Sequence, residues 1–162
     1  MDSPFGNMMT LDVRKKNVPL PWIKKKVLSL HTEDNNQMNK VVYNLFSNAL
    51  KFTPSGGSVA LAFRIEGNNV VISVADTGKG IPDSDKPNIF KRFYQSASND
   101  SSQTGSGIGL HIASDYVQLH HGTISVSDNQ PAGSIFTVTL PVTSGKENHG
   151  KGVMISQAHL YI

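Results

Sequence analysis

Apolar residues recur at steps of three and four between Asn36 and Phe52, the period of an amphipathic helix that buries one face. The buried face is predicted to hold Met38, Val41, Val42, Leu45, Phe46 and Ala49. The segment Thr53–Gly57 is rich in Gly, Pro and Ser and therefore predicts the end of this helix.

A second helical pattern begins near Ile108 and is expected to stop at Gly122. Its apolar positions are Ile108, Ile112, Ala113, Tyr116, Val117 and Leu119. The segment Ile89–Tyr94 predicts a third, short helix. Between the short helix and the second long one, residues 95–104 are almost all small and polar, which is typical of a mobile loop.

Period-two alternation predicts the strands. Val59–Ile65 and Val70–Val74 form an expected hairpin around a Gly-Asn-Asn turn, and Thr123–Val126 and Ile135–Leu140 are expected as the last two strands. Near the N-terminus, two apolar runs at residues 18–23 and 27–30 are candidate edge strands, because prolines in the first run exclude a central position.

This order of elements predicts an α+β domain, a two-layer sandwich whose mixed, mostly antiparallel sheet is covered on one face by helices. Residues 1–10 lack periodicity and are expected to be a linker or an expression remnant, 11–143 the domain, and 144–162 a flexible tail. A chain of 162 residues is long enough for one core without disulfides, and it contains no cysteine.

Charge and hydropathy exclude several classes of function. No stretch approaches the ~20 apolar residues of a membrane span, so we expect no direct membrane contact. The formal charge of +3 comes from the two ends of the chain. Between residues 31 and 141 there are seven Lys and Arg against nine Asp and Glu, a balance of 7 − 9 = −2, which disfavours nucleic-acid binding.

A polar stripe follows the other side of the first predicted helix. It consists of Lys40, Asn44, Ser47, Asn48 and Lys51. Amide oxygens can ligate a hard cation such as Mg²⁺, and a lysine can neutralise phosphate. An ordinary solvated helix face is the alternative interpretation, and the helix alone does not decide between the two.

Two glycine-rich segments add candidate chemistry. Asp76 ends an apolar strand just before Gly78 and Gly80, so its carboxylate could accept a hydrogen bond from an amine on a flat ring; a turn aspartate that caps its own backbone is the alternative. Gly105–Leu110 leads into a helix N-terminus, which favours an anion, but fits neither a Walker A loop nor a dinucleotide fingerprint.

In this order, the polar stripe, Asp76-Thr-Gly-Lys-Gly80, Ile89-Phe-Lys-Arg-Phe-Tyr94 and Gly105-Ser-Gly-Ile-Gly-Leu110 resemble the N, G1, F and G2 boxes of a known family. The chain is similar to the ATP-binding catalytic domain of sensor histidine kinases, in the GHKL superfamily. The resemblance covers about residues 34–141 and implies the two-layer GHKL sandwich, with ATP and Mg²⁺ as cofactors.

The resemblance implies roles for individual residues. Asn48 and Asn44 would hold Mg²⁺, and Lys51 would contact phosphate. Adenine would meet the carboxylate of Asp76 in a pocket lined by Gly78, Gly80 and Ile81. The residues of the glycine-rich segment that would approach the triphosphate are Gly105, Gly107, Ile108, Gly109 and Leu110.

Three further residues are implied less directly. Arg92 is a candidate for phosphate or for a partner domain, with an ordinary surface arginine as the alternative. Phe93 is a candidate in the nucleotide site, although Phe90 and Phe93 are expected mainly to anchor the base of the lid. Ser134 is expected near the adenine, where the family often has Thr at or beside this position.

The resemblance also separates kinase from ATPase. The ATPase branches of the GHKL superfamily use a Glu one turn before the Mg²⁺ ligand to activate water. In this chain that position is Asn44, whose amide cannot take a proton. The expected function is phosphoryl transfer from Mg-ATP to a histidine. A GHKL ATPase, or a nucleotide-binding regulatory module without kinase activity, is the alternative.

The expected partners follow from a missing motif. No segment resembles the phosphoacceptor histidine motif of the family, so the histidine is expected on a separate dimerisation and phosphoacceptor helical domain of the same kinase. A downstream response-regulator receiver domain is the second expected partner. The resemblance implies a cytoplasmic location in a membrane-bound parent kinase.

Overall fold

The computed structural model describes residues 8–12, 35–96 and 107–141, which form two helices and one sheet. Strand β1 spans Met8–Asp12, and helix α2 spans Asn35–Phe52. Strands β2 and β3 span Ser58–Glu66 and Asn69–Asp76. Helix α3 spans Gly109–Leu119, and strands β4 and β5 span Thr123–Asp128 and Ser134–Pro141. The two candidate strands at residues 18–23 and 27–30 lie outside the described residues.

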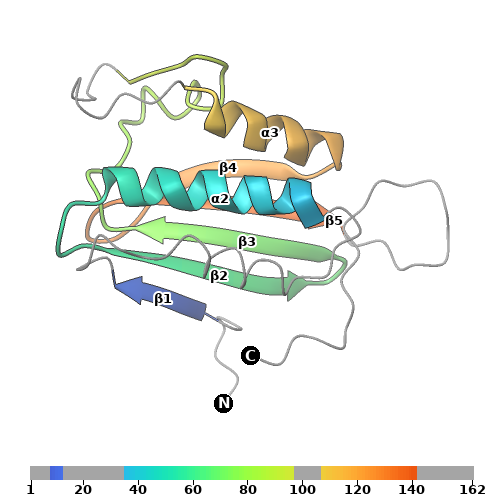
Figure 1. The fold of residues 1–162 in the computed structure, drawn as a ribbon, viewed down its shortest axis with the longest axis horizontal. Helices are drawn as coiled ribbons and strands as arrows, with labels where there is room; N and C mark the ends of the chain where they lie inside the picture. The colour runs from blue at the N-terminus through green and yellow to red at the C-terminus, as the bar shows by residue number, and fades with distance from the viewer. Residues whose placement is uncertain (1–7, 13–34, 97–106, 142–162) are drawn as a thin grey trace, which may run out of the picture.

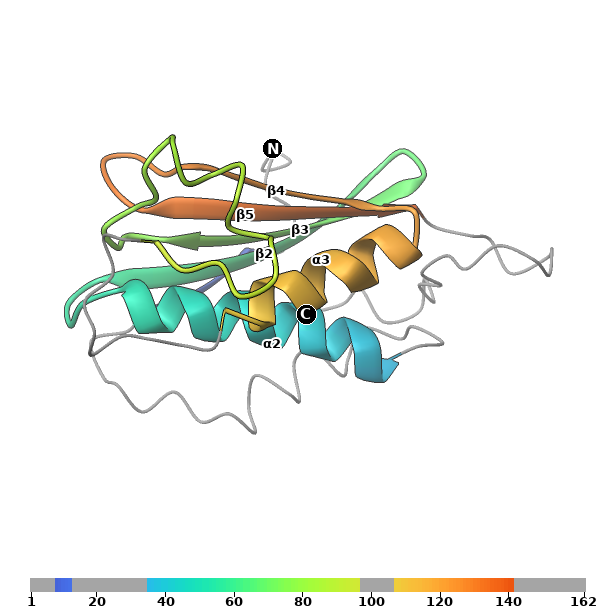
Figure 2. The ribbon, with the colours of Figure 1, turned by 90° about the horizontal axis from the view of Figure 1, so that it is seen from above.

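The five strands form one sheet in the order β1-β2-β3-β5-β4 (Figure 1). All four pairings are antiparallel, so the mixed character expected of the sheet is not found among the described strands. Both helices lie on the same face of the sheet, which confirms the predicted two-layer α+β sandwich (Figure 2).

The core fills the space between the helices and the sheet. Helix α2 buries the five apolar positions predicted from Val41 onward, each at most 1% exposed. On the sheet, the period of two directs alternate residues of β3 and β5 toward the helices. These are Val70, Ile72, Val74, Phe136, Val138 and Leu140.

Helix α3 departs in part from its prediction. Ala113, Tyr116 and Val117 are buried as expected, but Ile112 is 44% exposed and Leu119 is 57% exposed. At 100° per residue these two positions fall at the edge of the buried face rather than at its centre. The sequence pattern therefore overestimated the width of the buried face.

One further prediction is corrected by the structure, and one strand was not predicted. Ile89–Tyr94 is a series of turns and not a helix. Its backbone hydrogen bonds reach back three residues, as from Lys91 N–H to the Asn88 carbonyl, and Pro87 has no N–H to extend a ladder. Strand β1 was not predicted, and its first three residues lie in the expected linker, where they pair with β2.

Candidate functional site

A pocket of about 360 Å³ opens between α2, the loop that follows β3 and the start of α3. Ten predicted site residues line it: Asn44, Asn48, Lys51, Asp76, Gly80, Ile81, Gly107, Gly109, Leu110 and Ser134. The fold thus brings together residues from three of the four motifs and from the last strand, which the sequence separates by up to 90 positions. The short fourth segment supplies Ile89 and Tyr94, which were not predicted as site residues.

The other predicted site residues lie elsewhere. Gly78 is not among the lining residues, although its N–H binds the Asp76 carboxylate, and Ile108 precedes α3 and accepts a hydrogen bond from the Ile112 N–H. Arg92 and Phe93 are exposed outside the lining, with the guanidinium carbon 4.8 Å from the centre of the Phe93 ring. A ligand contact by Arg92 stays a prediction. Gly105 lies outside the described residues.

Asp76 is the buried acid of the site. It follows Val70, Ile72 and Val74 at every second position of β3, so the pleat turns its side chain toward the helices. Its Oδ1 accepts hydrogen bonds from the Gly78 N–H at 2.9 Å and from the Ser134 N–H at 3.2 Å. Desolvation by burial nevertheless raises the pKa of the carboxyl above its ordinary value, because it outweighs both hydrogen bonds.

Two glycines make this arrangement possible. A Cβ at Gly133 would lie 1.9 Å from the Asp76 carbonyl oxygen, and Gly133 has φ 104°, a conformation that favours glycine. A Cβ at Gly78 would lie 2.4 Å from the Phe52 carbonyl oxygen. Strand β5 and the end of α2 can therefore approach the acid closely only because both positions lack a side chain.

The other end of the pocket is built on α2. Asn44, Asn48 and Lys51 succeed one another at one-turn intervals and all face the pocket. Gly109, the first residue of α3, lies opposite, and a Cβ there would be 3.6 Å from the Asn44 Oδ1. The Asn44 amide thus faces the N-terminus of α3, and the Asn48 amide lines the same pocket.

This donor set suits a metal that phosphate also binds. Within the described residues, no group of three or more His, Cys, Asp or Glu side chains could hold a metal ion. Mg²⁺ keeps several waters and is bound by few protein oxygens together with substrate phosphates. The amide oxygens of Asn44 and Asn48 fit such a shared site, but not a site formed by protein alone.

Two lysines share an aromatic ring beside these amides. The Nζ atoms of Lys51 and Lys79 lie 5.3 and 5.2 Å from the centre of the Phe52 ring, which also lines the pocket. Neither Lys79 nor Phe52 was predicted as a site residue from the sequence. Their position next to Gly78, Gly80 and Lys51 was the available signal. The pocket therefore carries two cations and an aromatic surface.

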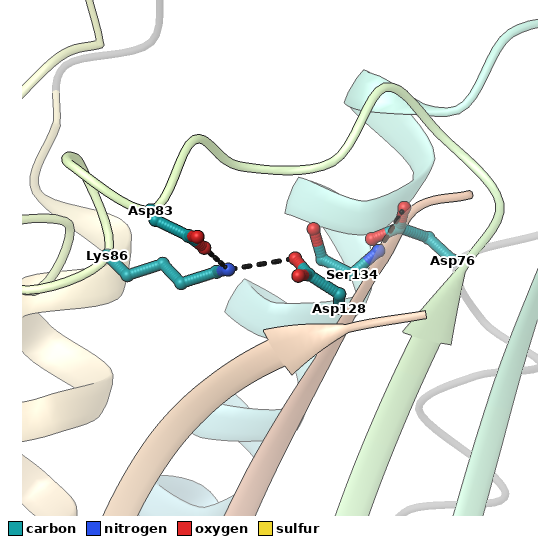
Figure 3. Close-up of polar contacts among 5 residues, drawn as sticks. All are labelled: Asp76, Asp83, Lys86, Asp128 and Ser134. Carbon is teal, nitrogen blue, oxygen red and sulfur yellow. Dashed lines mark hydrogen bonds and ion pairs between the residues drawn. The ribbon is translucent and has the colours of Figure 1, made fainter. Parts of the chain in front are cut away.

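Ion pairs connect the loop after β3 to the sheet. Lys86 forms ion pairs with Asp83 in the same loop and with Asp128 at the end of β4, the latter at 2.8 Å (Figure 3). Both carboxylates raise the pKa of Lys86. This bridge connects the wall of the pocket to the strand pair that carries Ser134.

A second set of polar contacts orders the same wall. Asp85 accepts hydrogen bonds from the Tyr94 hydroxyl at 2.7 Å and from the Ser96 hydroxyl, and both lower its pKa. The Phe93 N–H donates to the Gly107 carbonyl at 3.1 Å. Gly107, with φ 69°, leaves no room for a side chain against the Phe93 backbone. These contacts hold Tyr94 in the pocket lining.

The pocket thus has two chemically different ends. One end holds a buried carboxylate whose Oδ1 is occupied by two backbone donors. The other presents two amide oxygens, two ammonium groups nearby and the N-terminus of α3, whose free N–H groups favour an anion. Such an arrangement suits an elongated ligand with a hydrogen-bond donor at one end and negative charge at the other.

Comparisons with known proteins agree on one family. The family model described as "Histidine kinase-, DNA gyrase B-, and HSP90-like ATPase" matches residues 33–144. The sensor histidine kinase TmoS of Ectopseudomonas mendocina is 40% identical over 113 residues, which cover 68% of this chain. The adaptive-response sensory kinase SasA of Synechococcus elongatus is 42% identical over 110 residues, or 67% of this chain.

Solved structures share the fold. The mycobacterial sensor histidine kinase MprB has a TM-score of 0.64 at 29% identity, covering 75% of this chain and 90% of that one. The catalytic domain of the histidine kinase ThkA has a TM-score of 0.61 at 20% identity, covering 83% of this chain and 95% of that one. At such low identity the second comparison supports the fold alone.

The matched region is a small part of the curated relatives. It spans 12% of TmoS and 28% of SasA. Neither of the two described helices, at residues 35–52 and 109–119, combines the length and apolar character required to cross a membrane.

Proposed function

Because this chain belongs to the histidine kinase-, DNA gyrase B- and HSP90-like ATPase family, and its fold is that of a histidine kinase catalytic domain, we propose that it binds Mg-ATP and transfers the γ-phosphoryl group to a histidine. The observation that carries the proposal is the buried carboxylate of Asp76 at one end of a pocket whose other end presents Asn44 and Asn48.

Asp76 recognises the base in this proposal. The Gly78 and Ser134 N–H groups both bind Oδ1, and among the described residues no hydrogen bond reaches Oδ2. Oδ2 accepts a hydrogen bond from the exocyclic amine of adenine. Burial makes the site prefer a ligand that carries this amine, because a ligand without it would leave the buried carboxylate without a hydrogen-bond donor, which costs free energy of binding. Gly80 and Ile81 border the ring.

The phosphates lie toward α2 and the start of α3. Asn48 and Asn44 supply amide oxygens to Mg²⁺, while Lys51 neutralises phosphate charge. The backbone N–H groups that begin α3, near Gly109 and Leu110, add donors for phosphate oxygens. When bound, Mg²⁺ neutralises charge on the transferred group and aligns it for displacement. The chain's own contribution is to position and orient the triphosphate.

The acceptor is a histidine rather than water. A neutral imidazole is a nucleophile near pH 7 and does not require a strong base. Asn44 faces the pocket but, as an amide, cannot remove a proton from water. None of the described residues that line the pocket is a histidine, so the acceptor comes from a separate helical dimerisation and phosphoacceptor domain.

The phosphohistidine then passes its phosphoryl group to the receiver domain of a response regulator. The domain works on the cytoplasmic side of a membrane-bound parent kinase.

Phosphotransfer to an added acceptor tests the function. The chain is incubated with γ-labelled Mg-ATP and, separately, with helical phosphoacceptor domains of the related kinases. A kinase gives an acid-labile, base-stable label on at least one acceptor, and Asp76→Asn abolishes it. Steady release of ADP without an acceptor indicates an ATPase instead. Tight nucleotide binding with neither product indicates a regulatory module.

A further inference from the structure

Asn129, in the turn between β4 and β5, contacts the main chain of Asp76, the buried acid of the site. Its Nδ2 donates a hydrogen bond to the main-chain carbonyl of Asp76 at 2.8 Å, across 53 positions of sequence. The Asn129 side chain is half-buried and does not line the pocket. It belongs to none of the motifs that the sequence analysis identified.

This hydrogen bond stands at the point where the sheet ladder stops. The pairing of β3 with β5 ends at Ala75 and Ile135, one residue before Asp76. On the β5 side, therefore, Asp76 is held by two contacts instead of a ladder. Asn129 binds its carbonyl, and the Ser134 N–H binds its carboxylate.

The amide group of Asn129 is itself fixed in place. Its Oδ1 accepts from the Gln130 N–H at 2.9 Å, and the main-chain N–H of Asn129 donates to the Gly133 carbonyl at 3.0 Å. The side chain therefore needs an acceptor at one atom and a donor at the other. Aspartate lacks the donor, and alanine lacks both.

We propose that Asn129 is a positioning residue for base recognition: it holds the end of β3 against the β4–β5 turn, so that the Asp76 carboxylate stays aligned with the exocyclic amine of the purine. The inference rests on the proposed function, in which Asp76 accepts from that amine. Asn129 acts through Asp76 and has no contact with the nucleotide.

A separate contact keeps the turn in place when Asn129 is changed. Asp128, the neighbouring residue, pairs with Lys86 and so binds the same turn to the loop after β3 (Figure 3). Replacing Asn129 therefore releases the Asp76 carbonyl while the turn remains anchored. The change should affect the orientation of the acid more than the stability of the fold.

The test is the ratio of two binding constants. Isothermal titration measures the affinity of the full chain for Mg-ATP and for the Mg complex of purine riboside 5′-triphosphate, which lacks the 6-amino group. The ratio is compared among the original chain, Asn129→Ala, Asn129→Asp and Asp76→Asn. Gln130→Ala is the matched control, because it alters the adjacent exposed side chain and leaves its main-chain N–H.

We expect the preference for ATP to fall about fivefold in both Asn129 variants, as for one misaligned hydrogen bond. Gln130→Ala should leave it unchanged. A preference that persists in both Asn129 variants but disappears in Asp76→Asn overturns this inference alone. A preference that survives in Asp76→Asn overturns the proposed function instead.

Equal losses for both nucleotides in the Asn129 variants would show a merely structural role and contradict positioning. Asn129 variants that fail to fold, as judged by circular dichroism at 10 °C, would also contradict the positioning role, because the fold itself would then depend on Asn129.

Discussion

The two ends of the pocket differ in burial and in the kind of group that they present. At the base end, Asp76 is 4% exposed, and main-chain groups of Gly78 and Ser134 hold its carboxylate. At the phosphate end, Asn44 and Asn48 are half-buried and Lys51 is exposed, all on one face of a helix. Specificity is concentrated in one desolvated group, whereas charge neutralisation is distributed over several solvated groups.

The difference predicts how each end responds to change. A single substitution at the base end removes an interaction that water cannot replace, so its effect should be large. At the phosphate end, water and salt compensate for the loss of one group, so the effect should be smaller and depend on ionic conditions. The following predictions run from the largest expected effect to the smallest.

Replacing Asp76 by Asn should have the largest effect. The amide is nearly isosteric but places a donor where the ligand amine needs an acceptor, so Mg-ATP affinity should fall about tenfold to a hundredfold, the range for a hydrogen bond to a charged group. Isothermal titration measures the change. Asp115→Asn, an exposed carboxylate of α3, should bind normally; equal affinity in both variants would refute the assigned role of Asp76.

Replacing Asn48 by Ala should remove the benefit of the metal. In Mg²⁺ the affinity for ATP should fall about tenfold, within the range for lost contacts to a metal site. In EDTA the variant and the original chain should bind alike, because no metal contact remains to lose. Asn68→Ala, in the exposed β2–β3 turn, serves as control. An equal loss with and without Mg²⁺ would contradict a metal-binding role.

Replacing Lys51 by Met should weaken ATP binding about threefold at low salt, as expected for one exposed charge contact. The loss should shrink as salt is raised, and the affinity for ATP should depend less steeply on salt than in the original chain. Lys40→Met alters an exposed lysine of the same helix that does not line the pocket. The phosphate contact would be disproved by identical salt dependences in the two variants.

The smallest expected effect is on the stability of the unliganded protein. Burial raises the pKa of Asp76, so the folded state binds this proton more readily than the unfolded state. The carboxyl therefore favours folding below the ordinary pKa of aspartate, and this contribution is lost as the pH rises through the raised pKa. At neutral pH, Asp76→Asn should slightly increase the free energy of unfolding.

Urea unfolding at a series of pH values checks this sign. The stability of Asp76→Asn relative to the original chain should increase from acid toward neutral pH and then level off. A relative stability that decreases over this interval would mean that the carboxylate is favoured by the fold, contrary to its burial. Together with the affinity loss, the predicted result would show a group kept for binding at the expense of stability.

Features of the fold and the pocket that depend on local spacing could be predicted from the sequence. Period alone located α2 and four strands. The structure extends the third strand to Asp76, in line with Val70, Ile72 and Val74, so the same period of two accounts for the burial of the acid. The glycines at 107 and 109 and the amides on α2 were equally readable, because local spacing determines which face they occupy. The fold and most of the pocket lining were therefore predictable.

The remaining parts depend on contacts distant in sequence. Strand β1 has little pattern of its own and is defined by pairing with β2. Asn129 reaches Asp76 only because the sheet order places β5 beside β3. Lys79 reaches the pocket through the path of the loop, and Ile89–Tyr94 forms turns instead of the predicted helix, directly after Pro87, which has no N–H. Local periodicity carries none of this information.

The central claim is that Asp76 binds the purine amine while Asn44 and Asn48 face the metal and phosphates. A crystal structure of the chain with Mg²⁺ and a non-hydrolysable ATP analogue tests it most directly. We expect the exocyclic nitrogen about 2.8–3.2 Å from the Asp76 carboxylate and Mg²⁺ bound to an α2 amide oxygen. A nucleotide bound elsewhere, or one whose base lies toward α2 and whose phosphates lie toward Asp76, would contradict it.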